Sequence, residues 1–305
     1  MKNSNQSKFN KFFHKRISNH NNPKSCKEET NNSKSKLKIL QININGIQNK
    51  FSELKQIVAD TSPDVITIQE SKLNIDSHTL NMPGYITIRK DRSNKIGGGL
   101  ITYVKDEISF TEIESSKIAT SDKQEIIIIR INLTSSKKFH ITNMYLPPRD
   151  TNTSYLNEDK ELEQLFNQLL NLQNNIITGD MNAHSNLWHS TLIDHRGKII
   201  SDIIQNSDHI AINMDTPTQI PFDKTQKTTS PDVTFIPNEF SQNSTWNTNY
   251  SLNSDHLPIT TVINTKTNFK LIQYRNSYTN YKKANWKKYH QQFSIIIIII
   301  IIIIR

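Results

Sequence analysis

The sequence contains a single cysteine, Cys26, which lies in a polar segment near the start of the 305 residues. One cysteine excludes a disulfide within the chain, which is typical of proteins in a reducing compartment. No apolar segment follows the basic first residues, so we predict no secretory signal peptide. These absences favour an intracellular protein, in the nucleus or the cytoplasm.

Patterns typical of two common hydrolase sites are also missing. A zinc site is not supported, because there is no second cysteine and no histidine pair at helical spacing within a hydrophobic helix. No Gly-x-Ser-x-Gly motif is present, which argues against a serine nucleophile. His184, His189 and His195 cluster in one stretch, and metal ligation by them stays open. We interpret them as loop histidines near the substrate.

One long apolar run is present, the ten isoleucines of residues 295–304. A helix needs roughly 20 apolar residues to span a bilayer, so this run is too short. A membrane anchor is the less favoured interpretation, and we expect no membrane partner. We interpret the run as a translated simple repeat that replaces or truncates a native continuation.

Charge is distributed unevenly along the chain, whose net charge is +9. Residues 1–38 carry ten Lys/Arg and two Glu, and residues 266–305 carry eight Lys/Arg and no acid, so residues 39–265 have a net charge of −7. Basic arms of this kind suit nucleic-acid phosphates, and an acidic body suits a carboxylate metal site. The alternative, that codon bias produced the composition and the arms are merely solvated, stays equally open.

Apolar spacing between residues 37 and 265 predicts one mixed α/β domain. Helical spacing appears over residues 51–58, 162–170 and 199–204. We predict a disordered basic arm over residues 1–36, because these residues have almost no aliphatic side chains. A basic linker-like tail is predicted over residues 266–305. Short aliphatic runs predict strands at 37–44, 65–68, 100–104, 126–131, 139–145, 176–178, 210–212, 233–236 and 258–263.

Five polar clusters each follow an apolar run, where a sheet scaffold can bring distant side chains into one pocket. A carboxylate directly after a buried strand is costly unless it is solvated, paired or bound to a metal. Any single acid of this kind is more often a cap or turn residue, but the joint occurrence indicates a site for a hard metal ion and a phosphate ester. The clusters are Asn43-Ile44-Asn45-Gly46, Gln69-Glu70-Ser71-Lys72, Gly179-Asp180-Met181-Asn182, Ser230-Pro231-Asp232 and Ser254-Asp255-His256.

This ordered set resembles the endonuclease/exonuclease/phosphatase superfamily, which includes DNase I, abasic-site endonucleases and inositol phosphatases. The resemblance covers about residues 37–265 and implies a DNase I-like four-layer α/β sandwich, with two mixed sheets face to face and helices outside. Three motifs resemble more closely the endonuclease domain of jockey-like non-long-terminal-repeat retrotransposons. They are Gly179-Asp180-Met181-Asn182-Ala183-His184 with Trp188, Asp194-His195-Arg196-Gly197, and Thr229-Ser230-Pro231-Asp232-Val233-Thr234.

The resemblance implies a divalent cation, Mg²⁺ or Mn²⁺, as the cofactor. Glu70, with Asn43 beside it, is expected to hold this ion on the scissile phosphate, where it would offset charge on the nonbridging oxygens. Asp255 is expected to lie at the metal or directly behind it.

The resemblance also implies a catalytic set. Asp180 is expected to orient or deprotonate the attacking water, with Asn182 fixing its geometry. His256 is expected to donate a hydrogen bond to the phosphoryl group as a cation, oriented by Asp232. Tyr145 is expected to contact phosphate.

The function implied is metal-dependent hydrolysis of DNA, a nick that leaves a 3′-hydroxyl and a 5′-phosphate at a retrotransposition target. Asn45 and Pro148 depart from the DNA-repair relatives, which often have Asp at the first position and frequently a polar Asn at the second. An abasic-site nuclease, a phosphomonoesterase or an inactive nucleic-acid-binding remnant are the alternatives. Because the family carries a reverse transcriptase downstream, we expect a fragment, a degenerate copy or a mispredicted reading frame, with element RNA as a further partner of the missing region.

Overall fold

A computed structural model describes residues 35–92, 97–118, 121, 124–134, 137–149, 155–249, 253–265 and 268–272. The predicted arm, except for its last two residues, lies outside these described residues. So do most of the predicted tail and the isoleucine run. Among the helices of the described residues, none combines the length and apolar character that a membrane span requires.

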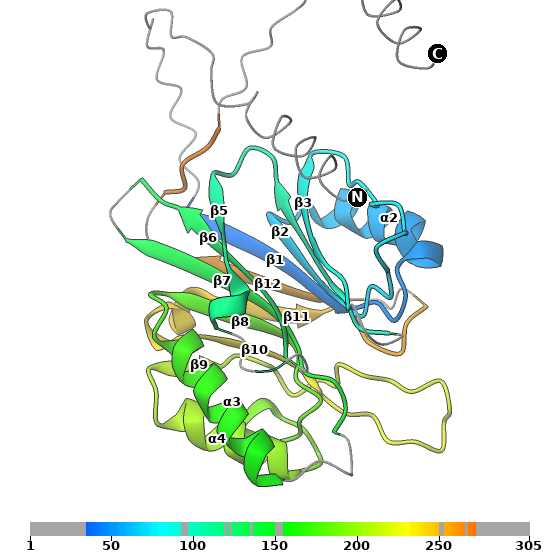
Figure 1. The fold of residues 1–305 in the computed structure, drawn as a ribbon, viewed down its shortest axis with the longest axis vertical. Coiled ribbons are helices and arrows are strands. Elements are labelled where there is room, and N and C mark those ends of the chain that lie inside the picture. The colour runs from blue at the N-terminus through cyan, green and yellow to red at the C-terminus, as the bar shows by residue number, and fades with distance from the viewer. Residues whose placement is uncertain are drawn as a thin grey trace, which may run out of the picture. The chain divides into compact units, whose positions relative to one another are not determined.

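Two mixed β-sheets form the centre of the fold (Figure 1). In the first sheet, strand β1 runs parallel to β2 and antiparallel to β12. The spatial order of this sheet is β11 (Thr245–Thr248), β12 (Ile259–Asn264), β1 (Lys36–Asn43), β2 (Val65–Gln69), β4 (Leu100–Lys105) and β3 (Tyr85–Lys90).

The second sheet repeats this arrangement with a parallel pair at its centre. Strand β7 runs parallel to β8 and antiparallel to β6, and β10 runs antiparallel to β8. Its spatial order is β5 (Phe110–Ile113), β6 (Glu125–Asn132), β7 (Lys138–Tyr145), β8 (Asn175–Asp180), β10 (Asp232–Pro237) and β9 (His209–Ala211).

Among the described residues, three α-helices form where the sequence predicts helical spacing. Helix α2 ends where Ser62 takes a left-handed conformation and its N–H donates to the Val58 carbonyl, just before Pro63. Helix α4 begins at the Asp194 cap, whose side chain accepts from the Gly197 N–H. The helices are α2 (Phe51–Thr61), α3 (Tyr155–Leu170) and α4 (His195–Gln205), with 3₁₀ turns η1 (Gln48–Lys50), η2 (Ser115–Lys117), η3 (Asn186–Trp188) and η4 (Asn238–Asn243).

Buried apolar side chains form three clusters, each between two layers of the fold. The middle cluster joins the facing sides of the two sheets, through residues such as Ile39 and Ile141. A second cluster packs α2 onto the first sheet through Leu54, and a third packs α3 and α4 onto the second sheet through Phe166 and Ile200. The predicted four-layer α/β sandwich is therefore confirmed, and Figure 1 shows α2 on one side of the sheets and α3 with α4 on the other.

Packing continues past residue 265, where we placed the end of the domain. Phe269 is buried and forms a bridge with Leu133, and Leu271 forms a bridge with Ile108. Phe269 also belongs to the cluster between the sheets. Residues 268–272 are therefore packed against the sandwich.

Candidate active site

Strand register brings the predicted residues to one edge of the sandwich. At the ends of the two parallel pairs, Asn43 lies opposite Gln69 and Tyr145 opposite Asp180. Because β10 is antiparallel to β8, its first residue, Asp232, is also opposite Asp180. The chain enters β12 from the same edge, since β12 is antiparallel to β1. The structure brings together all eight candidates: Asn43, Glu70, Tyr145, Asp180, Asn182, Asp232, Asp255 and His256.

Asn43 links the two sheets. Its Nδ2 donates to Glu70 Oε1 at 3.0 Å and to Asp180 Oδ2 at 2.8 Å. Its Oδ1 accepts from the Asn45 N–H at 3.1 Å, which fixes the orientation of the amide. Asn43 therefore presents its nitrogen to the two carboxylates, and its oxygen is engaged on the backbone.

Tyr145 supports the same carboxylate from the second sheet. Its hydroxyl donates to Glu70 Oε1 at 3.0 Å. Burial, followed by the charges of Glu70 and Asp180, raises the pKa of Tyr145 well above its ordinary value, so the hydroxyl remains a donor. The guanidinium of Arg92, paired with Glu125, lies 5.6 Å from the centre of the Tyr145 ring.

Asp180 is buried at the end of β8 and accepts three hydrogen bonds. Besides Asn43, the donors are the Asn182 N–H, at 2.9 Å from Oδ1, and Asn182 Nδ2, at 3.3 Å from Oδ2. Asn182 Nδ2 also donates to the Leu146 carbonyl at 2.9 Å. Asn182 thus ties Asp180 to the loop that follows Tyr145.

Four residues of this edge have a left-handed backbone, with φ of 48° at Asn45, 49° at Glu70, 53° at Lys72 and 42° at Asn182. Asparagine tolerates this region, but glutamate occupies it rarely, at a cost of order 1–3 kcal/mol. Such conformations persist only where the surrounding contacts impose them, and they cluster at functional sites. The contacts around Glu70 therefore hold a strained backbone at this edge.

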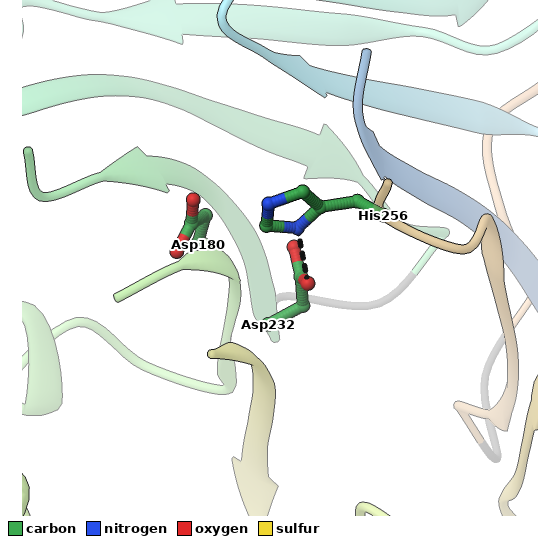
Figure 2. A group of neighbouring side chains, drawn as sticks. All are labelled: Asp180, Asp232 and His256. Atoms are coloured by element: carbon green, nitrogen blue, oxygen red, sulfur yellow. Dashed lines mark hydrogen bonds and ion pairs between the residues drawn. The ribbon is translucent and has the colours of Figure 1, made fainter. Parts of the chain in front are cut away.

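His256 and Asp232 form a buried pair. His256 Nδ1 lies 2.7 Å from Asp232 Oδ2, which also accepts from Thr218 Oγ1 at 2.8 Å. The other carboxylate oxygen of Asp232 accepts from Gln41 Nε2 at 2.9 Å. Figure 2 shows the second ring nitrogen of His256 on the side facing Asp180. The pairing on Nδ1 thus orients the imidazole and leaves Nε2 directed toward Asp180.

Our sequence reasoning missed a chain of buried amides behind this pair. Gln41 Nε2 also donates to Gln69 Oε1 at 3.0 Å, and Gln69 Nε2 donates to Asn143 Oδ1 at 2.7 Å. Asn143 Nδ2 in turn reaches the carbonyls of Ile68 and Ile101. The signal was available, because alternation along β1 places Gln41 on the same side as Asn43.

Two groups at this edge, Asp180 and His256, have a pKa above its ordinary value. Burial, and then the charge of Asp232, raises the pKa of Asp180 to about 7. Burial alone would lower the pKa of His256, but Asp232, with help from Asp180 and Asp255, raises it to about 10. His256 is therefore a cation at neutral pH, which suits the hydrogen-bond donor to phosphate that the family resemblance implies.

Lys72, Asn45 and Asp255 form the exposed rim. The Lys72 ammonium lies 3.5 Å from Glu70 Oε2 and donates to Asn45 Oδ1. Asp255 accepts from Asn45 Nδ2 at 3.4 Å and from Gln219 Nε2 at 3.0 Å. Burial raises the pKa of Asp255, but the Gln219 hydrogen bond and the charge of His256 outweigh it and lower the pKa overall.

Two places at this edge could hold a metal ion, the cluster of Asp180, Asp232 and His256 and the carboxylate of Glu70. Asp180, Asp232 and His256 each offer a ligand atom within 4.8 Å of the others. In that set, however, both oxygens of Asp232 and one nitrogen of His256 are already engaged. Glu70 fits better: its Oε1 accepts from Asn43 and Tyr145, but its Oε2 faces the exposed Lys72 ammonium, a cation that can move away and let this hard oxygen bind a metal ion.

Two of the three clustered histidines contact other side chains, and His195 begins α4 rather than lying in a loop. His184 Nδ1 lies 3.1 Å from Ser190 Oγ within its own loop, and His195 Nε2 lies 3.0 Å from Asp159 of α3. His189 takes a left-handed conformation after η3. Their expected proximity to substrate stays a prediction.

Sequence comparisons connect the chain with mobile elements. A family model described as endonuclease-reverse transcriptase matches residues 139–260. The RNA-directed DNA polymerase from mobile element jockey of Drosophila funebris is 25% identical over 215 residues, which are 70% of this chain and 22% of that protein. The Drosophila melanogaster relative is 25% identical over 229 residues, 74% of this chain and 24% of that protein. The chain thus spans about a quarter of the length of these relatives.

Solved structures share the fold. The endonuclease domain of TRAS1, a telomere-specific non-long-terminal-repeat retrotransposon, matches with a TM-score of 0.58 and 18% identity over 76% of this chain and 99% of that domain. The AP endonuclease LMAP from Leishmania major matches with a TM-score of 0.64 and 14% identity, over 75% of this chain and 88% of that chain. The predicted resemblance of this chain to the endonuclease/exonuclease/phosphatase superfamily, and within it to the endonuclease domains of non-long-terminal-repeat retrotransposons, is therefore confirmed.

Proposed function

We propose that this chain is a metal-dependent endonuclease that nicks duplex DNA and leaves a 3′-hydroxyl and a 5′-phosphate, as target-site cleavage for retrotransposition requires. One observation carries the proposal. Asn43 joins Glu70 and Asp180 from opposite sheets, while the His256–Asp232 pair lies within 4.8 Å of Asp180. This arrangement supports the proposal, because the scheme needs a carboxylate for a cation, a carboxylate for water and a cationic donor for phosphate close to one another.

Glu70 is the residue proposed to hold Mg²⁺ or Mn²⁺, with Asp255 at the rim. When bound, the ion supplies positive charge that stabilises the nonbridging oxygens of the scissile phosphate. Asn43 and Tyr145 hold the Glu70 carboxylate in place by their hydrogen bonds. Asn43 acts in this scheme through its nitrogen, as a spacer between two carboxylates, rather than as an oxygen ligand.

Asp180 and His256 have different proposed roles: Asp180 acts on the attacking water, and His256 donates a hydrogen bond to the phosphate. Asp180, held by Asn182, orients the attacking water and accepts its proton, a role to which its raised pKa is suited. As the water oxygen bonds to phosphorus, the bond from phosphorus to the 3′ oxygen breaks, and this oxygen takes a proton from solvent to leave as the 3′-hydroxyl. His256 donates from Nε2 to the phosphoryl oxygen, while Asp232 holds Nδ1 and the ring orientation.

A nicking assay tests the proposal. The full chain is incubated with supercoiled plasmid and Mg²⁺ and should yield nicked circles whose 3′ ends a DNA polymerase extends, and EDTA should abolish the reaction. Asp180→Ala and His256→Ala should each lower kcat by about 10²- to 10³-fold without unfolding the protein. Asp60→Ala, which removes an exposed acid from α2, is the matched control.

Substrate choice separates the alternatives. A duplex with one abasic site and a set of inositol phosphates are tested beside the plasmid. Turnover confined to the abasic duplex would point to a repair nuclease, and turnover confined to inositol phosphates would point to a phosphomonoesterase. Salt-sensitive DNA binding with no turnover of any substrate would identify an inactive nucleic-acid-binding remnant.

A further inference from the structure

Arg196 is a buried cation that the proposed chemistry does not use. Its residue is 8% exposed, and it lies in the first turn of α4. A positive charge at a helix N-terminus is electrostatically unfavourable, because the helix dipole is positive there. Its burial in that position therefore requires strong compensating contacts.

The compensating contacts reach both loops that follow the parallel strand ends of the second sheet. Arg196 Nη1 donates to the Pro147 carbonyl at 2.9 Å and to the carbonyls of Met181 and Asn182, both at 3.2 Å. Pro147 lies two residues after Tyr145, and Met181 directly follows Asp180. One guanidinium group thus joins the backbones that carry two candidate catalytic residues.

Glu158 of α3 anchors the other edge of the guanidinium. Its Oε1 accepts from Arg196 Nε at 3.0 Å and from Nη2 at 2.5 Å, and its Oε2 lies 3.0 Å from Arg149 Nε. A planar fork of donors is needed to reach Glu158 and three carbonyls at once, which a lysine ammonium cannot do.

The neighbouring glycine allows this approach. A Cβ at Gly197 would lie 1.9 Å from the His184 carbonyl oxygen, so only glycine lets the first turn of α4 pack against the loop after Asp180. The Asp194 N–H also donates to that carbonyl at 3.0 Å. The Arg196-Gly197 part of the sequence motif therefore has a geometric basis.

We propose that Arg196 is a positioning residue that holds the loops after Tyr145 and Asp180 in register, and thereby fixes Asp180 and Asn182 for reaction. This inference rests on the proposed nuclease function. The hydrogen bond from Asn182 Nδ2 to the Leu146 carbonyl joins the same two loops from the other side. Displacement of a positioned group by about 1 Å can cost roughly 10²-fold in rate, so small loop movements should be visible in kcat.

Arg196→Lys in the full chain tests the proposal through two readouts. Amide hydrogen exchange, measured by NMR, should accelerate about tenfold or more at Leu146 and Asn182, whose N–H groups donate to Asp180, but not at Ile263 of β12. In plasmid nicking, kcat should fall about 10- to 100-fold while KM stays within about twofold. Arg130→Lys on β6, whose Nη2 donates to Thr111 Oγ1 at 3.5 Å, is the matched control.

The outcomes are distinguishable. Unchanged exchange at Leu146 and Asn182 overturns the inference, and so does faster exchange accompanied by an unchanged kcat. A wild-type chain that nicks no substrate overturns the proposed function, and the exchange rates alone then decide the inference. If Arg196→Lys does not fold, Glu158→Gln replaces it, because it weakens the anchor and should accelerate the same amides. Unchanged exchange in that variant overturns the inference as well.

Discussion

At the scale of single residues, Gln41 connects the His256–Asp232 pair to the buried core. Its Nε2 donates to Asp232 Oδ1 and Gln69 Oε1. Gln41→Met keeps the volume and removes both donors, so Asp232 loses a partner in a fully buried position. We expect stability to fall by about 1–3 kcal/mol and kcat to fall about tenfold, measured by urea unfolding and plasmid nicking.

The matched control is Gln168→Met on the exposed face of α3, which should change neither quantity. If Gln41→Met unfolds at the wild-type urea concentration and nicks at the wild-type rate, the amide chain does not hold Asp232.

The raised pKa of Asp180 predicts a pH-dependent response to metal. Burial, and then Asp232, raises this pKa to about 7. A carboxyl whose pKa is higher in the folded state stabilises the metal-free fold below its ordinary pKa of about 4, and that stability is lost as pH rises through about 7. Cations bind the deprotonated carboxylates, so Mg²⁺ should raise Tm more at pH 8 than at pH 5.5.

Thermal melts with and without millimolar Mg²⁺, at matched ionic strength with Na⁺, measure this difference. An equal shift at both pH values, or a larger one at pH 5.5, would contradict a coupling between cation binding at Glu70 and ionisation of Asp180, the two carboxylates that Asn43 joins.

The sequence predicted the charged residues of this edge better than the residues that support them. Acids and the histidine that directly follow aliphatic runs, such as Asp180, stand out because a strand end is a costly place for a charge. Thr218 and Lys72 carry no such signal. Thr218 lies in a loop whose path depends on tertiary contacts, and lysines after strands are common. Residues that act through partners become visible only once the partners are placed.

At the scale of elements, the parallel pair β7 and β8 depends on one glycine. Gly179 has φ of 153°, and a Cβ there would lie 1.9 Å from the Met144 carbonyl oxygen. Gly179→Ala should therefore separate the strands that carry Tyr145 and Asp180 and cost about 3 kcal/mol, seen as a lower Tm. Gly84→Ala, whose φ of 78° adds strain but whose Cβ meets nothing within 4 Å, should cost less. Equal melting temperatures for the two variants would refute this account.

The strands that the pattern missed share one property. Strands β3, β5 and β11 each lie at an edge of their sheet. In β3, only Ile88 of six residues is buried. Edge strands are paired on one side only and covered less, so their sequences keep fewer apolar residues and a weaker alternation. The central strands β1, β2, β7 and β8 are covered on both faces, which is why their aliphatic runs were informative.

At the scale of the whole molecule, the basic ends should govern how DNA is held rather than how it is cut. Residues 1–34 carry eight Lys/Arg and two Glu, and residues 273–305 carry six Lys/Arg and no acid. A chain of residues 35–272 would change the net charge from +9 to −3 and still contain all eight candidate residues.

The packing of the two chain ends decides where the chain can be truncated. The Thr265 N–H donates to the Ser35 carbonyl at 2.8 Å, and Phe269 is buried between the sheets, so removal of residues beyond 265 would damage the fold. In the 35–272 chain, we expect KM for plasmid to rise and the slope of log affinity against log salt to become shallower, because fewer phosphates are neutralised. The kcat at saturating DNA should stay within about threefold of the full chain, since the arms supply association and the strand ends supply the chemistry. Nicking across a salt series measures both quantities. A large fall in kcat, in a truncated protein that keeps the melting temperature of the full chain, would contradict the view that the arms supply only association.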